Sequence, residues 1–330
     1  MYKIGALGLT FTIRLSASYD IFAIETLAAC QLLERTHNLW DKPYQICEIV
    51  PEHNMRCMTE YPFKEFLPKD AAKDWLNQFD LLVLPAQYFP DEQTSKLPMT
   101  KQMLELLPHY KGELVAFKQD AREKFSHWMT EAVLQDLAPQ ADVSVWCPAH
   151  YPVQWTGALL RNMPGPYIQK ASQKPNIDYG CVFGNFQASP DRLRVLKQYA
   201  PRSTFMIGRQ LDMFPSITNG EMVSSAKLKE LSMASATTVI HIEPCLLDEG
   251  AWFTSRIAQA LAWGLHMLIP KEYAWAFRKF GFSDEFLTYM YVRDAEESIA
   301  CMRGFKRSDA FREHILSLNW QEYKRLAWNK

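Results

Sequence analysis

Short apolar runs alternate with helical or loop-like segments along the whole chain. In the first half these runs lie at residues 2–9, 44–50, 79–85, 113–117 and 143–147. A second series lies at residues 179–183, 204–207, 237–242, 265–269 and 290–292. Strands that alternate with helices are typical of a parallel sheet with helices on both faces. The pattern therefore predicts an α/β protein with two parallel sheets.

The length and one linker-like segment predict two domains. A chain of 330 residues corresponds to two domains of about 150 residues each. RNMPGPYIQKASQKPNID, rich in Pro, Gly, Ser and Gln, separates the two series and predicts a hinge at residues 162–176. We expect Rossmann-like domains at 1–168 and 169–307. We also expect a helix at 308–330 that crosses back towards the first domain, with Asp309 available to cap it.

The composition is that of an ordinary globular protein, with 48% hydrophobic and 22% charged residues. Its apolar stretches, about 10 residues at most, are too short to span a membrane, and the strand-like start YKIGALGL leads us to expect no cleavable leader. We therefore expect a cytosolic protein. The seven cysteines never form Cys-x-x-Cys and the eight histidines are dispersed, so we expect reduced thiols and no zinc site, while a bridging divalent ion stays open.

The formal net charge of −1 argues against a nucleic-acid binder, since such binding rests on many Lys and Arg side chains. A local basic surface can nevertheless exist, and Lys118, Arg122, Lys124 and His127 gather in FKQDAREKFSHW. The alternative for this cluster is a solvated loop and helix start.

Polar side chains follow four of the predicted strands. They are Ser18 and Asp20, Asp120, Gly184 and Asn185, and Glu243. Ligands in parallel sheets bind beyond the carboxyl ends of the strands, so two such sheets predict one cleft lined by these loops. Asp120, with cationic neighbours that keep it ionised, suits a general base. Asp20 and Asp120 could equally cap helices, and Asp120 could pair with Arg122 or Lys124.

The segment from Glu243 to Tyr273 indicates a bound anion. It predicts a strand-end carboxylate, a helix with Arg256 and Gln259 near its start, a stop at Gly264 and a buried strand at 265–269. An Arg in the first helical turn favours a diphosphate, and Gln259 on the same face could bond a ribose hydroxyl. A nucleotide sugar fits this layout. The alternatives are a salt bridge from Arg256 to Asp248 or Glu249, and a surface amide at Gln259.

GNFQASPDRLRVLKQYA begins with a Gly turn after a predicted strand and continues into a helix that carries Arg192. Such a turn can present backbone N–H groups to a phosphate, although the segment has neither GxGxxG nor the P-loop pattern.

In order and spacing, six segments from Ser18 onward resemble the T-even bacteriophage DNA β-glucosyltransferases. They are AWFTSRIAQALAWGLHMLIPKEY, YVRDAEESIACMRGFKRSDAFREHILSLN, IDYGCVFGNFQASPDRLRVL, FDLLVLPAQYF, FKQDAREKFSHW and HYPVQW. The resemblance implies the GT-B glycosyltransferase fold, in which two Rossmann-like domains face each other across a cleft. It also implies a UDP-sugar donor, UDP-glucose or UDP-arabinose, a possible Mg²⁺ or Mn²⁺ ion, and duplex DNA containing 5-hydroxymethylcytosine as partner.

The resemblance also implies roles for individual residues. Asp120 takes the place of the family's catalytic base. The sugar-binding positions correspond to Asp20, with Ser18 beside it, and to the strand-end Glu243. The UDP-binding positions are Gly184, Asn185, Gln187 (where the family has Arg), Arg192, Val223 (whose backbone meets uracil), Arg256 and Gln259 (where the family has Glu). The implied DNA contacts are Gln87 and Phe89, near the gap that a flipped base leaves. From the basic cluster described above, we also expect Lys118, Arg122 and Lys124 to contact DNA.

These expectations describe a monomeric inverting glycosyltransferase, in the host cytoplasm for a phage protein. It would transfer glucose or arabinose to the hydroxymethyl oxygen of 5-hydroxymethylcytosine in duplex phage DNA, with base flipping. The alternatives are 5-hydroxymethyluracil as acceptor, a carbohydrate or small-molecule acceptor on the same fold, and a non-catalytic module that binds a nucleotide sugar or DNA.

Overall fold

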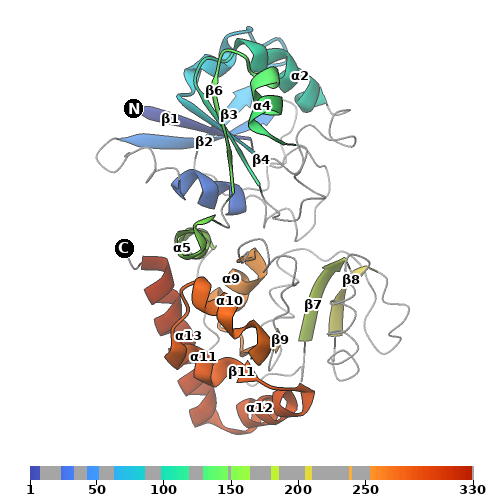
Figure 1. Ribbon diagram of the computed structural model, residues 1–330, viewed down its shortest axis with the longest axis vertical. Coiled ribbons are helices and arrows are strands. Elements are labelled where there is room, and N and C mark those ends of the chain that lie inside the picture. Colours follow the sequence, from blue (N-terminus) through green and yellow to red (C-terminus); the bar gives the residue numbers. More distant parts are fainter. Residues whose placement is uncertain are drawn as a thin grey trace. The chain divides into compact units, whose positions relative to one another are not determined.

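The chain divides into two compact units, Met1–Ala158 and Leu159–Lys330. The computed structural model describes residues 1–7, 24–32, 43–51, 63–85, 98–118, 129–147, 150–163, 180–185, 205–209, 238–239 and 253–328. Each unit is built on one parallel sheet (Figure 1). The predicted α/β class with two parallel sheets is confirmed. The predicted boundary at residue 168 and the return of the C-terminal helix to the first domain stay predictions.

The sheet of the first unit has six parallel strands. They are β1 (Tyr2–Ala6), β2 (Tyr44–Pro51), β3 (Lys64–Leu67), β4 (Leu81–Pro85), β5 (Glu113–Phe117) and β6 (Asp142–Trp146). Their spatial order is β3-β2-β1-β4-β5-β6. This is the doubly wound Rossmann order, and it reverses between β1 and β4, where ligands bind in such sheets.

Alternating side chains give this sheet two buried faces. On one face Cys47, Ile49, Leu82 and Leu114 belong to a core that also takes in residues of η1 (Trp75–Gln78), α2 (Pro98–Leu106), η2 (Leu107–His109) and α4 (Glu131–Leu137). On the other face the ring of Phe117 meets Trp155 of α5 (Pro152–Asn162) at 6.3 Å between centroids. Burial of each large apolar side chain contributes about 1.5–3 kcal/mol to the free energy of folding.

The edge strand β3 was missed by the apolar pattern. Its sequence KEFL carries two charges in four residues, and Phe66 within it remains 52% exposed. An edge strand needs little apolar character because it packs on only part of its surface. The pairing of such an edge strand therefore leaves no apolar pattern in the sequence.

The sheet of the second unit has five parallel strands. They are β7 (Gly180–Asn185), β8 (Phe205–Arg209), β9 (Thr238–Val239), β10 (Met267–Pro270) and β11 (Tyr291–Val292). Their order is β11-β10-β9-β7-β8. Renumbered within the unit, this is the flavodoxin-like order 2-1-3-4-5, which reverses between β7 and β9.

The described helices that follow β9 in the chain belong to the second unit. They are α9 (Ser255–Ala262), η7 (Lys271–Tyr273), α10 (Ala274–Lys279), α11 (Asp284–Met290), α12 (Ala295–Arg307) and α13 (Asp309–Trp328). The long helix α13 packs against α9, α11 and α12. Its buried Asn319 donates to the carbonyl oxygen of Leu265 at 2.9 Å, and its Tyr323 hydroxyl donates to that of Leu160 at 2.8 Å. None of the described helices has the length and apolar character that a membrane span requires.

Ser308, rather than the expected Asp309, caps α13. The hydroxyl of Ser308 accepts from the backbone N–H of Phe311 at 3.2 Å. Asp309 is the first helical residue, and its carboxylate pairs with the buried Arg312. The guanidinium of Arg312 also donates to the carbonyl oxygens of Phe305 and Lys306, at 3.1 and 3.2 Å. Asp309 thus helps to join α12 to α13 instead of closing the helix end.

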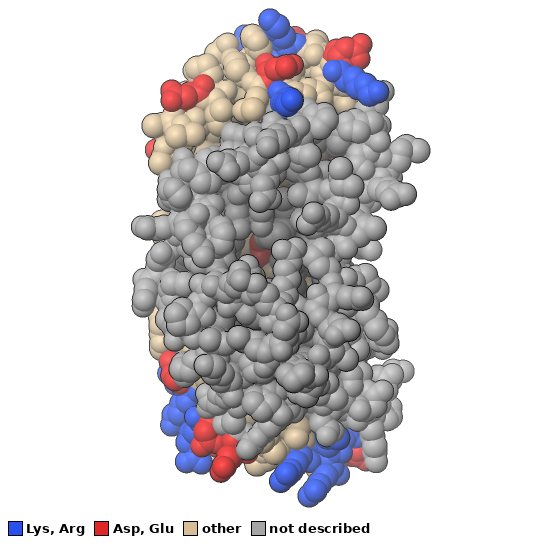
Figure 2. Space-filling model, turned by 90° about the vertical axis from the view of Figure 1, so that its right-hand side faces the viewer, with Lys and Arg blue, Asp and Glu red and all other residues tan. Residues whose placement is uncertain are grey.

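Charged side chains of both signs stand next to one another in each unit on the face shown in Figure 2. This mixture agrees with the formal net charge of −1. The described part of this face therefore presents no surface of one sign.

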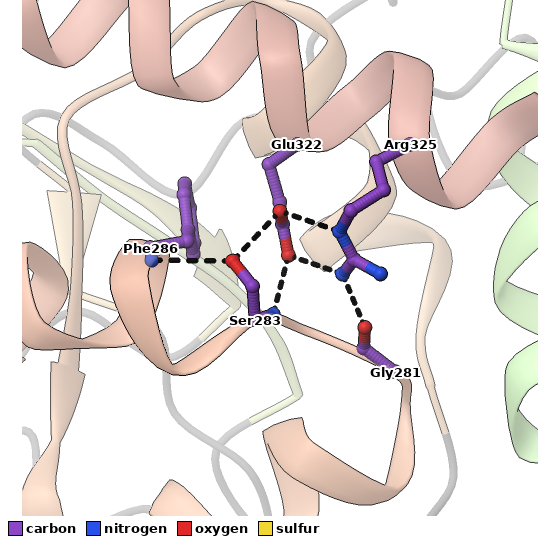
Figure 3. Close-up of polar contacts among 5 residues, drawn as sticks. All are labelled: Gly281, Ser283, Phe286, Glu322 and Arg325. Carbon is purple, nitrogen blue, oxygen red and sulfur yellow. Dashed lines mark hydrogen bonds and ion pairs between the residues drawn. The ribbon is translucent and has the colours of Figure 1, made fainter. Parts of the chain in front are cut away.

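A buried carboxylate ties α13 to the turn before α11 (Figure 3). Glu322 accepts from the backbone N–H and hydroxyl of Ser283, at 2.6 and 3.0 Å. It also accepts from Nε and Nη2 of Arg325, at 3.0 and 2.6 Å. Arg325 in turn donates to the carbonyl oxygen of Gly281, whose φ of 91° favours glycine. The carboxylate thus accepts four hydrogen bonds, which offsets the cost of burying its charge.

Candidate functional site at the carboxyl ends of the two sheets

In the first unit, three neighbouring strands lead into the segments predicted to carry the chemistry. Ala6 of β1 pairs with Val83 of β4, and Pro85 of β4 pairs with Phe117 of β5. All three strands therefore end at the same edge of the sheet, on both sides of the point where the strand order reverses. Ser18 and Asp20 follow β1, Gln87 and Phe89 follow β4, and Asp120, Arg122 and Lys124 follow β5; these seven residues lie outside the described residues.

Lys118 is the predicted DNA-binding residue that the structure describes. It follows β5 directly, is partly exposed, and donates its backbone N–H to the carbonyl oxygen of Trp146 at 2.9 Å. This bond continues the pairing of β5 with β6 one residue beyond Phe117. The start of the segment that leads to Asp120, two residues later, is therefore held at the carboxyl edge of the sheet.

In the second unit, the end of β7 carries Gly184 and Asn185. Val182 pairs with Ile207 of β8, whereas Asn185 pairs with Arg209, so β7 contains one residue more than β8 over this stretch. Such a bulge bends a strand and is common beside active sites. It falls where a loop that carries phosphate-binding N–H groups would begin. Four further predicted residues, Gln187, Arg192, Val223 and Glu243, lie outside the described residues.

Helix α9 brings Arg256 to the same edge of this sheet. α9 lies in the chain between the parallel neighbours β9 and β10, and its last turn leads directly into β10. Its amino end therefore points to the carboxyl ends of the strands. The predicted stop is confirmed: Gly264 has φ 67°, and the N–H of Leu265 bonds the carbonyl oxygen of Ala260 at 3.0 Å.

An aromatic cluster holds the amino end of α9 in place. Phe253, two residues before the helix, is fully buried, and its ring lies 5.1 Å from Phe280 and 6.0 Å from Phe282. Within the described residues, the side chain of the N-cap residue Thr254 accepts no hydrogen bond from the first turn. The backbone N–H groups of a first helical turn have no acceptor within the helix, which favours an anion at this end of α9.

Gln259 is buried, with 6% of its surface exposed. The alternative that it is a surface amide is therefore wrong, because helix α9 is enclosed on the face that carries it. Arg256 precedes it by three residues on the same helix. The alternative partners of Arg256, Asp248 and Glu249, lie outside the described residues.

The described residues contain no group of three His, Cys, Asp or Glu side chains that could hold a metal ion. They also offer no activated thiol among the buried cysteines. Burial raises the pKa of the Cys30 thiol to about 12, which keeps it protonated at neutral pH.

The strand-end reasoning missed two features of the first unit. Glu48 of β2 is fully buried and Glu25, in the helical stretch 24–32, is 4% exposed. The signal for Glu48 was present, as a charged residue inside the apolar run YQICEIV. The second feature is a stacked pair, Trp146 at the end of β6 and Tyr151 beyond it, with ring centroids 5.6 Å apart.

Neither a protein-family model nor a curated protein matches the chain by sequence. Solved structures do match it. T4 phage β-glucosyltransferase in complex with UDP and Mn²⁺ matches with a TM-score of 0.58 at 13% identity, over 99% of this chain and 95% of that chain. The same T4 phage enzyme with UDP-glucose matches with a TM-score of 0.57 at 12% identity, over the same shares.

An α-glucosyltransferase in complex with UDP and a 13-mer DNA containing an HMU base is similar to the same degree. Its TM-score is 0.57 at 10% identity, over 98% of this chain and 95% of that chain. At such identities the likeness shows the fold. The chain has the GT-B glycosyltransferase fold over nearly its whole length, as the sequence predicts.

Proposed function

We propose that this protein is a DNA glycosyltransferase that transfers a sugar from a UDP-sugar to the hydroxymethyl oxygen of 5-hydroxymethylcytosine in duplex DNA. The observation that carries the proposal is the likeness of nearly the whole chain to phage glucosyltransferases bound to UDP, UDP-glucose and DNA. Fold alone does not define chemistry. The proposal therefore also rests on where the predicted residues follow the strands.

The strand order supports a shared site in each unit. Residues predicted to bind the sugar and DNA follow β1 and β4, the strands between which the first sheet reverses. Residues predicted to bind the diphosphate and the sugar follow β7 and β9, the strands between which the second sheet reverses. Open α/β sheets bind their ligands at these points. The strand orders of both sheets thus support the same assignment of sugar-, DNA- and diphosphate-binding roles.

In the proposed reaction, Asp120 accepts the proton of the hydroxymethyl group. The oxygen uses the freed electron pair to attack the anomeric carbon, and the bond from that carbon to the diphosphate oxygen breaks. UDP leaves with the electron pair, and Arg256 and Arg192 stabilise its growing negative charge. The single displacement inverts the anomeric centre. The base leaves the duplex stack first, because the hydroxymethyl group cannot reach a buried donor within the helix.

The donor is UDP-glucose or UDP-arabinose, and Gln259 would bond the ribose in place of the family's carboxylate. A divalent ion such as Mg²⁺ or Mn²⁺, when bound, would add Lewis-acid stabilisation at the diphosphate. The described residues gather no ligand set for it. The steps proposed above use the protein's own side chains.

One finding favours a second acceptor. The α-glucosyltransferase neighbour is bound to DNA that contains an HMU base. 5-Hydroxymethyluracil carries the same reacting hydroxymethyl group, so Asp120 would serve it by the same proton transfer. The neighbours include an α- and a β-glucosyltransferase, and the inverting course proposed here rests on Asp120 as a single base.

The Asp120→Asn variant tests the role of the base. Asparagine keeps the size of the side chain but cannot accept the proton, so we expect transfer to fall by about 10²-fold or more. UDP affinity, measured by calorimetry, should stay within twofold of the wild type. Asp136→Asn, a change in α4 away from the strand ends, should leave both quantities unaltered. Equal losses of transfer and UDP binding in Asp120→Asn would contradict this role.

A further inference from the structure

Two aromatic rings stack at the carboxyl end of the edge strand β6. Trp146 is the last residue of this strand, and the Tyr151 ring lies over it with 5.6 Å between centroids and 25° between planes. Just before Tyr151, the N–H of His150 bonds the carbonyl oxygen of Cys147 at 3.1 Å. Tyr151 nevertheless remains 41% exposed.

The start of α5 holds the Tyr151 ring in position. The N–H of Trp155 donates to the carbonyl oxygen of Tyr151 at 2.8 Å, and Trp155 itself is fully buried against Phe117. Phe117 and Trp146 are register partners at the ends of β5 and β6. One short segment therefore places two rings on two neighbouring strand ends. The Trp155 ring is buried, and the Tyr151 ring is partly exposed to solvent.

The exposed ring covers the end of β6, the register neighbour of β5, and β5 precedes the proposed base in the chain. The backbone N–H of Lys118 bonds the carbonyl oxygen of Trp146, and Asp120 follows two residues later in the chain. Lys118 is itself partly exposed. An exposed aromatic face at a strand end suits a nucleotide, since the face can stack on the base.

We propose that Tyr151, backed by Trp146, stacks on a nucleobase that has left the DNA duplex and so positions it for transfer. The inference rests on the proposed function, because it takes DNA as the acceptor. Stacking accepts any base, so this contact strengthens binding of extruded DNA without reading its sequence. Tyr151 is a positioning residue, while the proton transfer remains with Asp120.

The test is the affinity for a fluorescein-labelled duplex with one central 5-hydroxymethylcytosine, measured by anisotropy with UDP present at several salt concentrations. Tyr151→Leu should weaken binding about tenfold, the typical loss of one base–aromatic stack. The slope of log Kd against log salt should not change, because stacking releases no counterions. Tyr151→Phe keeps the ring and should bind like the wild type. UDP affinity should be the same in all variants.

Trp320→Leu is the matched control. Trp320 of α13 is also exposed, at 38%, and its ring stacks on Tyr323 with 5.6 Å between centroids, but it lies at no strand end. Its replacement should leave DNA affinity unchanged. Should Tyr151→Leu lower the melting temperature, Tyr151→Met, with its flexible apolar chain, replaces it.

Wild-type affinity in Tyr151→Leu would overturn the stacking role, and so would an equal loss in Tyr151→Phe. A wild-type protein that binds no duplex would refute the proposed function itself, and this inference with it. The two failures are distinguishable, because in the first the wild-type protein still binds DNA.

Discussion

His266 shows how a single side chain can couple stability to pH. It is 1% exposed, its ring stacks on Phe305 at 4.8 Å, and Phe311 meets it edge-on at 5.9 Å. Burial lowers the pKa of His266 to about 3, because the charged form is poorly solvated there. An imidazole enclosed by aromatic rings is therefore neutral in the folded protein.

We predict that His266 weakens the fold as the pH falls. Below the pKa of about 6.5 that a histidine has in the unfolded chain, the unfolded state takes up a proton that the folded state refuses. Stability is complete above pH 6.5 and falls towards pH 3, with a loss of about 2 kcal/mol at pH 5. His266→Gln should reduce the dependence of the free energy of unfolding on pH. Urea unfolding between pH 7 and pH 5 measures this dependence.

The exposed His314 gives the control for this prediction. His314→Gln should keep the acid dependence of the wild type. An unchanged slope in His266→Gln would show that His266 takes up its proton in the folded protein as readily as in the unfolded chain.

At the residue scale, the sequence predicted some features of local chemistry and missed others. Gly264 was foreseen because a helix stop needs a residue that tolerates positive φ. The cap of α13 was assigned to Asp309 instead of Ser308, since both residues can cap and only the three-dimensional position of Arg312 draws the carboxylate away. The burial of Gln259 could not be read from the sequence either, because it depends on which elements enclose α9.

At the scale of elements, the Glu322 network sets how α13 meets the turn before α11. We predict that Glu322→Gln destabilises the protein by about 2 kcal/mol, because hydrogen bonds to a charged group are each worth about 1.5–3 kcal/mol and an amide replaces only some of them. Arg325 is partly exposed, so solvent recovers part of the loss. Urea unfolding of the full chain measures the change.

The exposed Glu313, on the same helix, provides the comparison. Glu313→Gln should change the free energy of unfolding by less than about 0.5 kcal/mol. Equal stabilities of the Glu322→Gln and Glu313→Gln variants would contradict a structural role for the network.

Most strands could be located from the sequence to within one or two residues. β5 has the predicted bounds, and β10 begins two residues later than expected. These strands are buried on both faces, and such strands appear as continuous apolar runs. The bulge in β7 was not foreseen, because it reflects pairing with β8, a strand some 20 residues away in the sequence.

At the scale of the whole molecule, two sheets of different strand order carry one proposed reaction. The first has the Rossmann order and the second the flavodoxin-like order. In each, some of the predicted site residues follow the strands at which the order reverses, while Asp120 follows the next strand, β5. The sequence could predict the strand ends, because apolar runs mark them, but not the order of the strands in each sheet. It could not predict side-chain geometry, which depends on how distant loops pack together.

Charge does not identify the acceptor on the described surface. Lys and Arg side chains mix with Asp and Glu side chains on the face in Figure 2, and the surface beside Gln87 lies outside the described residues. A basic stripe beside Gln87 and Lys118 would favour DNA, and an even surface would favour a small acceptor. The acceptor is therefore best identified by chemistry.

The most direct test is sugar transfer from a panel of UDP-sugars, including UDP-glucose and UDP-arabinose, to duplexes that carry cytosine, 5-hydroxymethylcytosine or 5-hydroxymethyluracil. Digestion to nucleosides and mass spectrometry then identify the donor and the acceptor together. We predict a mass gain of one sugar on 5-hydroxymethylcytosine and none on cytosine. No gain on any duplex from a protein that still binds UDP would contradict DNA glycosylation and favour a non-DNA acceptor on the same fold.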